Sequence, residues 1–276
     1  MQSEKMTEKE KIIDIKRLIK SKNPKAAKWI PGFIYSYLKR TLHEDDVNKS
    51  LNDNIGVKAI PFSDYVIEKF NIKVNFIGAE NIPKEGGVIF AANHPLGGMD
   101  AMAIVTEFKN YRTDFKFVVN DILMNIDNLK DMFVGVNKHG TNTKESLKVL
   151  NDLFASEQAV FVFPAGLVSR KKKGVVRDLE WKKTFITRSK KFERQVIPVH
   201  IDGELSKFFY RLSNFRTKIG IKANIEMLYL VDELYQQIDK EMNITFGKPI
   251  PHTAFDKGKK DIDWAQCVKE KVYELK

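Results

Sequence analysis

The sequence predicts an α/β fold in which helices cover both faces of a mostly parallel sheet, with a helical segment at the N-terminus. From residue 72 onward, short β-branched or aromatic runs alternate with helical stretches, and this alternation is typical of parallel sheets. The chain has 276 residues, 43% of them hydrophobic and 30% charged, which is enough to bury a core and too apolar for disorder. We expect a helical part over residues 1–60, which is a candidate for membrane contact, and an α/β domain over residues 61–276.

The N-terminal part carries apolar side chains at the three- to four-residue spacing of a helix face. The positions are Ile12, Ile13, Ile15, Leu18 and Ile19 in a first stretch, and Trp29, Ile30, Phe33, Ile34, Tyr37 and Leu38 in a second. Pro31 is tolerated only in the first turn of a helix. Lysine and arginine flank the second stripe, so it fits either an interfacial membrane helix or a helix that faces the protein core.

The α/β domain is expected to contain six strands, with helices between them and a charged helix at its C-terminus. The strands cover residues 72–77, 87–92, 115–119, 132–136, 159–163 and 196–201, and the helices cover 99–110, 121–131, 143–155 and 181–192. In such sheets, ligands bind beyond the carboxyl ends of the strands. This rule points to three junctions, at residues 93–100, 135–142 and 164–174.

The first junction joins an apolar strand to a helix through the sequence NHPLGGMD, which starts at Asn93. Asp100 follows His94 by six positions, and Gly97 and Gly98 between them permit a sharp turn. If the loop folds back, Asp100 accepts a hydrogen bond from one imidazole nitrogen, and the other nitrogen can take a proton from a hydroxyl. The plain alternative is that the two residues only cap a strand and a helix.

The sequence lacks the motifs of several other kinds of catalytic or binding site. The sequence has no G-x-S-x-G elbow, no H-E-x-x-H or Cys/His cluster typical of zinc, and no G-x-G-x-x-G loop. Its single cysteine, Cys267, excludes an internal disulfide and fits a reducing compartment. No run approaches the ~18 residues of a spanning helix, and the N-terminus lacks the apolar core of a secretion signal. We therefore expect a cytoplasmic chain whose lone base suits direct group transfer.

The net charge of +11 predicts a polyanionic partner. Residues 169–194 concentrate this charge, with eleven cations against three carboxylates. The segment fits a docking surface for an acidic carrier protein or for lipid headgroups, and it also fits a merely solvated helix face. Aromatic and basic residues are interleaved over 206–216, which suits a membrane interface, an RNA-binding surface or ordinary packing. We expect no nucleic acid partner because no nucleic-acid-binding motif accompanies the charge.

Three blocks of the sequence resemble the glycerolipid acyltransferase family, whose members acylate glycerol phosphate and lysophosphatidate. The first is the block over residues 93–100, the second is FPAGLVSR over 163–170, and the third is VIPV over 196–199. Their order, and the spacing of about seventy residues between the first two, match the family. The resemblance covers roughly residues 60–250.

The resemblance implies that His94 is the general base and that Asp100 orients it. It implies a fatty acyl thioester of coenzyme A or acyl carrier protein as the donor, with no metal and no further cofactor. Backbone amides around Gly97, Gly98 and Gly166 are expected to stabilise the oxyanion of the tetrahedral intermediate. The complete set of expected substrate-binding residues is Asn93, Gly97, Gly98, Lys138, Pro164, Gly166, Ser169 and Arg170.

The sequence departs from the family pattern in its spacing and in its polar groups. Five residues separate the histidine from the aspartate instead of the usual four. In the usual FPEGTRS block, Ala165, Leu167 and Val168 replace the glutamate, the threonine and the arginine, and Lys138 replaces an arginine after the preceding strand. Arginines bind phosphate in a bidentate manner, so their loss weakens the grip on a glycerol phosphate acceptor. Lys138 and Arg170 are the cations expected to compensate in part.

This variant, with DLEWKK at residues 178–183, resembles a bacterial subgroup that acts in ornithine- and glycine-lipid synthesis. Its members add a second acyl chain to the 3-hydroxyl of an N-(3-hydroxyacyl) amino acid, an acceptor without phosphate. We therefore expect an O-acyltransferase for lyso-ornithine or lyso-glycine lipid, bound peripherally at the cytoplasmic face of the bacterial inner membrane. Its expected partners are the lipid acceptor, the thioester donor and the membrane surface. The alternatives are a lysophosphatidate acyltransferase and a non-catalytic basic protein that binds nucleic acid or membrane.

Overall fold

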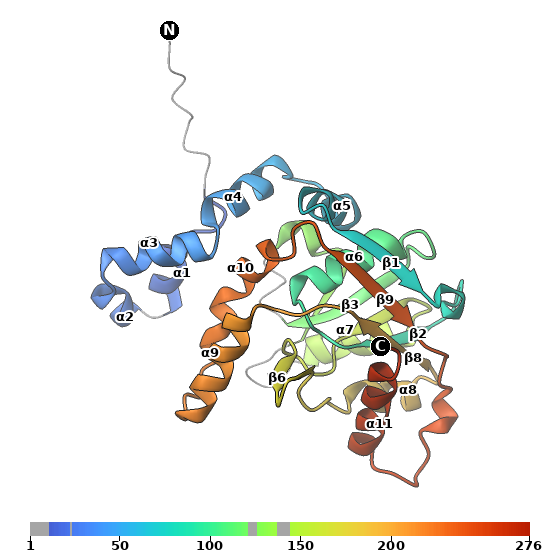
Figure 1. Cartoon of the computed structure of the whole chain (residues 1–276). Coiled ribbons are helices and arrows are strands. Elements are labelled where there is room, and N and C mark those ends of the chain that lie inside the picture. The colour runs from blue at the N-terminus through green and yellow to red at the C-terminus, as the bar shows by residue number, and fades with distance from the viewer. Residues whose placement is uncertain (1–10, 23, 121–125, 137–143) are drawn as a thin grey trace.

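The fold is described from a computed structural model, which covers residues 11–22, 24–120, 126–136 and 144–276. A seven-stranded sheet lies at its centre, in the order β1-β9-β8-β2-β5-β3-β4 (Figure 1). All neighbouring strands in it are parallel except β8 and β9. Its strands are β1 (Lys73–Ile77), β2 (Val88–Ala92), β3 (Phe115–Asn120), β4 (Phe133–Val136), β5 (Ala159–Val162), β8 (Gln195–Ile201) and β9 (Glu241–Phe246). Beside it, β6 (Arg170–Lys172) and β7 (Val175–Arg177) form a separate antiparallel hairpin.

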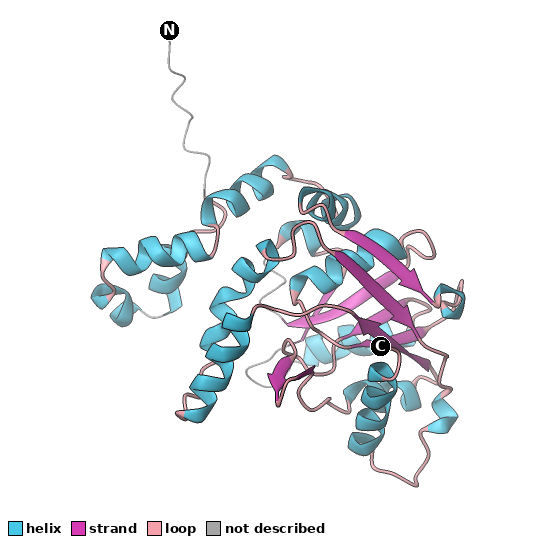
Figure 2. Cartoon of the chain, viewed as in Figure 1, coloured by secondary structure: helices cyan, strands magenta, loops and turns pink. Residues whose placement is uncertain are grey.

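Helices precede the sheet, cover it and follow it (Figure 2). The α-helices are α1 (Ile15–Lys22), α2 (Pro24–Trp29), α3 (Gly32–Thr41), α4 (Glu44–Asp53), α5 (Ala59–Lys69), α6 (Gly98–Phe108), α7 (Lys144–Ala155), α8 (Thr184–Lys191), α9 (Lys207–Lys218), α10 (Leu230–Tyr235) and α11 (Asp261–Tyr273). Short 3-10 turns are η1 (Ala79–Asn81), η3 (Asp127–Leu129), η4 (Ile225–Tyr229) and η5 (His252–Ala254). The α/β class and the mostly parallel sheet are therefore confirmed.

Alternation along the buried strands builds two cores, one on each face of the sheet. On β2, Phe90 points into a core that α5 and α6 cover, whereas Ile89 and Ala91 point into a core that α7, α8 and α11 cover. Phe90 stacks on Phe161 with ring centroids 4.5 Å apart, and Phe108 lies edge-on to both rings. This aromatic packing fixes β2 and α6, the two elements that flank the first predicted junction.

The six expected strands are present, each within one or two residues of its expected ends. The sequence interpretation missed β9, although Met242, Ile244 and Phe246 alternate with polar residues and their side chains are buried, the period-two pattern of a half-buried strand. The helix expected over 121–131 is wrong for the described residues 126–131, which contain only the single turn η3.

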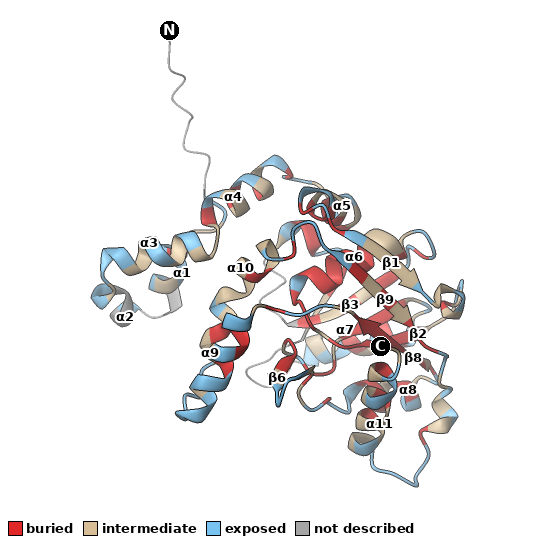
Figure 3. Cartoon of the chain, viewed as in Figure 1, coloured by how far each residue is buried: buried red, intermediate tan, exposed pale blue. Residues whose placement is uncertain are grey.

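The N-terminal helices lie to one side of the sheet and bury few of their side chains (Figures 1 and 3). The expected apolar stripe does not lie on one continuous helix, because α2 ends at Trp29 and Pro31 is the N-cap of α3. Contacts with residues 229–235 join this region to the C-terminal part of the chain. The Tyr37 hydroxyl lies 2.7 Å from that of Tyr229, His43 Nε2 lies 2.9 Å from Asp232, and Tyr235 stacks on His43 and donates to Asp46. In the described parts of the chain, no helix is long and apolar enough to cross a membrane.

Removal of the Phe161 ring should destabilise the fold strongly. Phe161 is fully buried and contacts the rings of Phe90, Phe108 and Phe117, so Phe161→Ala leaves a cavity and should lower the free energy of unfolding by about 3–5 kcal/mol. Phe215→Ala, at a residue that is 60% exposed on α9, should change it by less than about 0.5 kcal/mol. Urea denaturation measures both, and equal losses would contradict this placement of the core.

Candidate active site

His94 and Asp100 face each other across the loop between β2 and α6. The imidazole Nδ1 lies 2.8 Å from Asp100 Oδ2. Because an ionised carboxylate only accepts hydrogen bonds, this contact places the ring proton on Nδ1 and leaves the lone pair on Nε2. The imidazole keeps 19% of its surface exposed, whereas the carboxylate is completely buried. A buried carboxylate that orients a partly exposed base can support proton abstraction from a hydroxyl.

Asp100 is held in place by the first turn of α6. Its carboxylate accepts hydrogen bonds from the backbone N–H groups of Leu96 and Gly97, at 3.1 to 3.2 Å. Gly97 has φ 74°, a conformation that favours glycine, and this turn is what brings the two amides back to the carboxylate. Burial raises the pKa of Asp100 above its ordinary value, while the His94 and Leu96 hydrogen bonds act in the opposite direction.

The second predicted block wraps around His94. Phe163, which directly follows β5, stacks on the imidazole with ring centroids 4.2 Å apart. The N–H of Ser169 donates to the His94 carbonyl at 2.8 Å. The junctions at 93–100 and 164–174 therefore meet at the carboxyl edge of the sheet, as the rule for parallel sheets predicts.

The three glycine amides expected to stabilise an oxyanion differ in their availability. The N–H of Gly97 donates to Asp100, and that of Gly166 donates to the Phe163 carbonyl at 3.0 Å. Gly98 is exposed and is the first residue of α6, where a helix leaves its N–H groups without an intrahelical acceptor. Of the three, the Gly98 amide is the best placed to meet an external anion.

Four of the other predicted binding residues are built into the scaffold. The Asn93 side chain pairs with both backbone groups of Ile201, at 2.9 and 2.6 Å, and so extends the junction of β2 and β8. Pro164 is buried, and its carbonyl accepts from the N–H of Lys182. Ser169 and Arg170 are also buried. Lys138 lies outside the described residues.

Arg170 is not a free cation. Its guanidinium is 5% exposed and donates to Glu226 of η4 at 2.7 Å, and Arg216 of α9 contacts the same carboxylate. It also donates to the Val168 carbonyl at 2.6 Å. The expectation that Arg170 compensates for missing phosphate-binding groups therefore conflicts with its use in a buried ion-pair cluster, because replacing a buried partner is costly.

Val168 and Ala165, which stand where the family pattern has charged side chains, are buried among apolar groups. Val168 is 1% exposed and lies in the core on the α6 face, and a Cβ built on Gly97 would come within 3.4 Å of it. The same added atom would lie 3.8 Å from Leu230 of α10. Apolar packing by α10 thus occupies the place beside the first turn of α6.

Asp178, in the DLEWKK block, has no role predicted from the sequence, and the structure places it between the two loops. Its carboxylate accepts from the His94 N–H at 3.2 Å, from Ser169 Oγ at 2.5 Å and from Trp181 Nε1 at 2.8 Å. The signal in the sequence is an acid in a cation-rich segment, followed by tryptophan three positions later. Such a pattern alone does not show which groups the acid meets.

A cavity of about 280 Å³ lies behind the His94 loop, lined by Asn93, Pro95 and Ser169 together with His200 and Tyr273. His200 is buried, and this burial lowers its pKa. His94 itself does not line this cavity.

A sequence model of the acyltransferase family matches residues 17–276, almost the whole chain. The chain belongs to this acyltransferase family. It is 44% identical over 265 residues to the lyso-glycine lipid O-acyltransferase of Bacteroides thetaiotaomicron, covering 96% of this chain and 97% of that protein. It is 42% identical to the protein of the same name from Phocaeicola vulgatus, covering 96% and 95%.

Among solved structures, this acyltransferase is similar to the 1-acyl-sn-glycerophosphate (LPA) acyltransferase from Thermotoga maritima. The identity is 19% and the TM-score is 0.48, with 77% of each chain covered. The membership in an acyltransferase family supports the enzymatic interpretation of the sequence over the non-catalytic one.

The stability of the acyltransferase should depend on pH through Asp100. Its pKa is raised in the folded state, so the folded protein holds this proton more tightly, and the stabilisation is lost as the pH rises from about 4 through the raised value. Asp100→Asn removes the titrating group, so the stability of the variant lacks this decrease with pH. The unfolding free energy of the variant relative to the parent should therefore increase as the pH rises above about 4.

Asp114→Asn is the control, because its effect on stability should change with pH in the opposite direction. Arg112 lowers the pKa of Asp114, so this carboxylate stabilises the fold above its ordinary pKa, and the cost of its replacement should grow as the pH rises. Urea denaturation across the pH range measures both variants. A relative stability of Asp100→Asn that fell with pH would contradict the raised pKa.

Proposed function

We propose that this acyltransferase transfers a fatty acyl group from a thioester to the hydroxyl of a lyso-glycine lipid at a membrane surface. The choice of acceptor rests on the 42–44% sequence identity, over nearly the whole chain, to two proteins that are named for this acceptor. The geometry supports the chemistry, because His94 Nε2 has the lone pair that a general base needs. Lyso-ornithine lipid presents the same kind of 3-hydroxyl and is the related alternative.

In the proposed reaction, His94 Nε2 takes the proton of the acceptor hydroxyl as its oxygen attacks the thioester carbonyl. A carbon–oxygen bond forms, and the carbonyl oxygen becomes an oxyanion. The Gly98 amide, at the positive end of the α6 dipole, is proposed to stabilise this charge. The carbon–sulfur bond then breaks, and the imidazolium returns its proton to the departing thiolate. Asp100 stabilises the imidazolium in between.

The surroundings of the site support an acceptor without phosphate. Val168 is buried in an apolar core, and Arg170 is engaged by Glu226. Neither position offers the exposed guanidinium that would grip a phosphate in a bidentate manner. An acceptor whose head is an amino acid does not need that grip.

Purified enzyme given an acyl thioester should acylate N-(3-hydroxyacyl)glycine, with mass spectrometry detecting the diacyl product. We expect its kcat/KM for lysophosphatidate to be at least about tenfold lower, since loss of one good charge-assisted contact costs about 1.5–3 kcal/mol. Equal or better use of lysophosphatidate would overturn the acceptor assignment.

Loss of the His94 imidazole should reduce acyl transfer by on the order of 10³-fold or more, because base catalysis and its orientation both disappear. His252→Ala is the matched control, since this partly exposed histidine lies in η5, away from the loops that meet at His94. It should retain the parent rate in the same assay. Full activity of His94→Ala would remove the proposed base.

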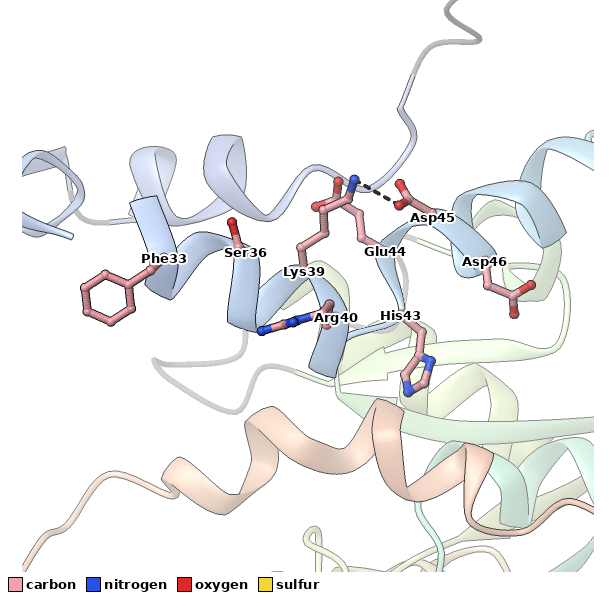
Figure 4. A pocket seen from close by; sticks show the side chains of 8 residues that line it. All are labelled: Phe33, Ser36, Lys39, Arg40, His43, Glu44, Asp45 and Asp46. Carbon is pink, nitrogen blue, oxygen red and sulfur yellow. Dashed lines mark ion pairs between the residues drawn. The ribbon is translucent and has the colours of Figure 1, made fainter. Parts of the chain in front are cut away.

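Membrane contact is proposed for the exposed aromatic face of α2 and α3. Trp29 is 86% exposed and Phe33 is 73% exposed, and none of the α3 side chains is buried. Figure 4 shows Phe33 pointing away from the α3–α4 corner, while His43 points from it toward α10, where it contacts Asp232. Exposed aromatic rings next to basic side chains are typical of interfacial helices.

A second apolar patch adjoins this face through α9 and η4. Its members are Phe208, Phe215, Ile219 and Leu228, each at least half exposed. The Tyr37–Tyr229 contact connects α3 to η4, and Phe208 packs edge-on against Tyr229. Leu230, the next residue, approaches the turn at Gly97. A lipid that left the membrane at this patch would therefore meet the loop that carries His94.

The corner between α3 and α4 forms an open cleft of about 590 Å³ beside the aromatic face (Figure 4). Its three acids already have cationic partners: Glu44 pairs with Lys11, Asp45 with Lys39 and Asp46 with Lys69. Arg40 adds a positive charge at the same corner. Basic side chains at this place suit anionic headgroups of the cytoplasmic leaflet, which supports the proposed inner-membrane location.

The donor carrier is proposed to be acyl carrier protein or coenzyme A, and both are anionic. Several cations of the basic segment over 169–194 are already engaged within the protein. Arg177 pairs with Glu270 and Lys190 with Asp261, and Arg194 donates to backbone carbonyls. Besides the paired Lys190, the exposed cations of this segment are Lys172, Lys173, Lys182, Lys183 and Lys191. These are the groups available to an acidic partner.

Trp29→Ser combined with Phe33→Ser should weaken vesicle binding. The two rings would otherwise transfer apolar area into the membrane interface, at about 1.5–3 kcal/mol for a fully buried large side chain. We expect the partition coefficient on anionic vesicles to fall at least tenfold, because a loss of about 1.5 kcal/mol of transfer energy corresponds to about a factor of ten in binding. Binding is measured by co-sedimentation with the vesicles. The Ile55→Ser variant, changed at an equally exposed apolar residue outside these helices, should co-sediment as the parent does. Unchanged sedimentation of the double variant would exclude this face.

A further inference from the structure

The carboxylate of Asp178 joins the two loops that meet at His94. Oδ1 accepts from the His94 backbone N–H and from the Ser169 hydroxyl, at 3.2 and 2.5 Å. The Ser169 N–H in turn donates to the His94 carbonyl at 2.8 Å. The backbone of His94 is thus held on both sides, by Asp178 at its N–H and by Ser169 at its carbonyl.

The burial of Asp178 makes these hydrogen bonds important. The residue is 5% exposed, and its second oxygen accepts from the indole N–H of the fully buried Trp181. An ionised carboxylate in such a place is costly unless donors satisfy it. Each of its three donors is therefore needed, and two of the three belong to the loops around His94.

Asp178 is itself anchored to the last helix. Its N–H donates to the Tyr273 hydroxyl at 2.7 Å, and its carbonyl accepts from Lys269 Nζ at 2.8 Å. Both partners lie on α11, which packs on the sheet through Ala265, Val268 and Val272. The carboxylate is therefore attached to a rigid element, so it can impose a position on the loops.

We propose that Asp178 is a positioning residue for acyl transfer, which sets the backbone of His94 relative to the second loop. Asp100 orients the imidazole ring, and Asp178 fixes the chain that carries it. The proposal rests on the proposed role of His94 as the base. It predicts an effect on turnover beyond any effect on stability, because a displacement of a catalytic group by about 1 Å can lower the rate about 100-fold.

The test compares Asp178→Asn with the parent in the acyl transfer assay. The amide keeps the size of the side chain but turns an NH₂ group toward one of three donors, and its neutral oxygen is a weaker acceptor than the carboxylate for the His94 and Ser169 donors. We expect kcat to fall about 10- to 100-fold, with the KM of donor and acceptor changed less than about threefold because neither substrate contacts Asp178 in the proposed reaction. A fall in affinity at unchanged kcat, or unchanged kinetics, would overturn the proposal.

Trp181→Phe separates positioning from stability. This change removes the third donor and some buried volume, but it leaves the His94 and Ser169 contacts. It should lower the thermal midpoint at least as much as Asp178→Asn and should keep kcat within about threefold, since the loop geometry is retained. If the two variants lost kcat in proportion to their loss of stability, Asp178 would be only a structural residue.

Ser169→Ala provides a milder variant in case Asp178→Asn folds poorly. It removes one hydroxyl from Asp178 and should lower kcat less than Asp178→Asn does. Ser189→Ala is its matched control, because this buried serine also donates at 2.5 Å, but to the Arg194 carbonyl. It should retain kcat, and equal losses in the two serine variants would contradict the proposal. Loss of activity in His94→Ala with full activity in Asp178→Asn would reject the positioning role alone, whereas full activity in His94→Ala would reject the proposed base.

Discussion

The arrangement depends on a carboxylate that is removed from water and still ionisable. Asp100 is fully buried, and it is held there by two loop amides and by the ring of His94. Removing a charge from water is costly, so every donor around it must be in place. That requirement explains the turn at Gly97, whose positive φ brings its own N–H to the carboxylate. The imidazole of His94 is held in one orientation because the Asp100 carboxylate that binds it is itself fixed by these donors.

The sequence predicted the parts of the structure that repeat a local pattern. The strands were found because they are short apolar runs, and His94 and Asp100 because a polar pair follows such a run. β9 was missed although its alternation is clear; it pairs with β1 on one side and with β8 on the other. Both edge strands, β1 and β4, were predicted, so the position of a strand in the sheet did not decide whether its local pattern was recognised.

Tertiary pairing limited what could be said of the site. Arg170 seemed a free cation because Glu226, its partner, lies 56 residues away in sequence. Asn93 seemed able to face a substrate, whereas its amide binds the backbone of Ile201, 108 residues away. Residue type and spacing indicate which chemistry is possible, but hydrogen-bond partners from distant segments decide whether a polar group is free to take part in it.

The strand order also constrains how the chain is made. Four adjacent strands, β2, β5, β3 and β4, all lie between residues 88 and 162, so the part of the sheet from β2 to the β4 edge can assemble while the ribosome is still producing the rest. β1 is different, since Lys73 pairs with Glu241, a separation of 168 residues. The first strand to leave the ribosome is thus among the last to find its neighbour, and its unpaired edge is exposed to wrong partners during synthesis.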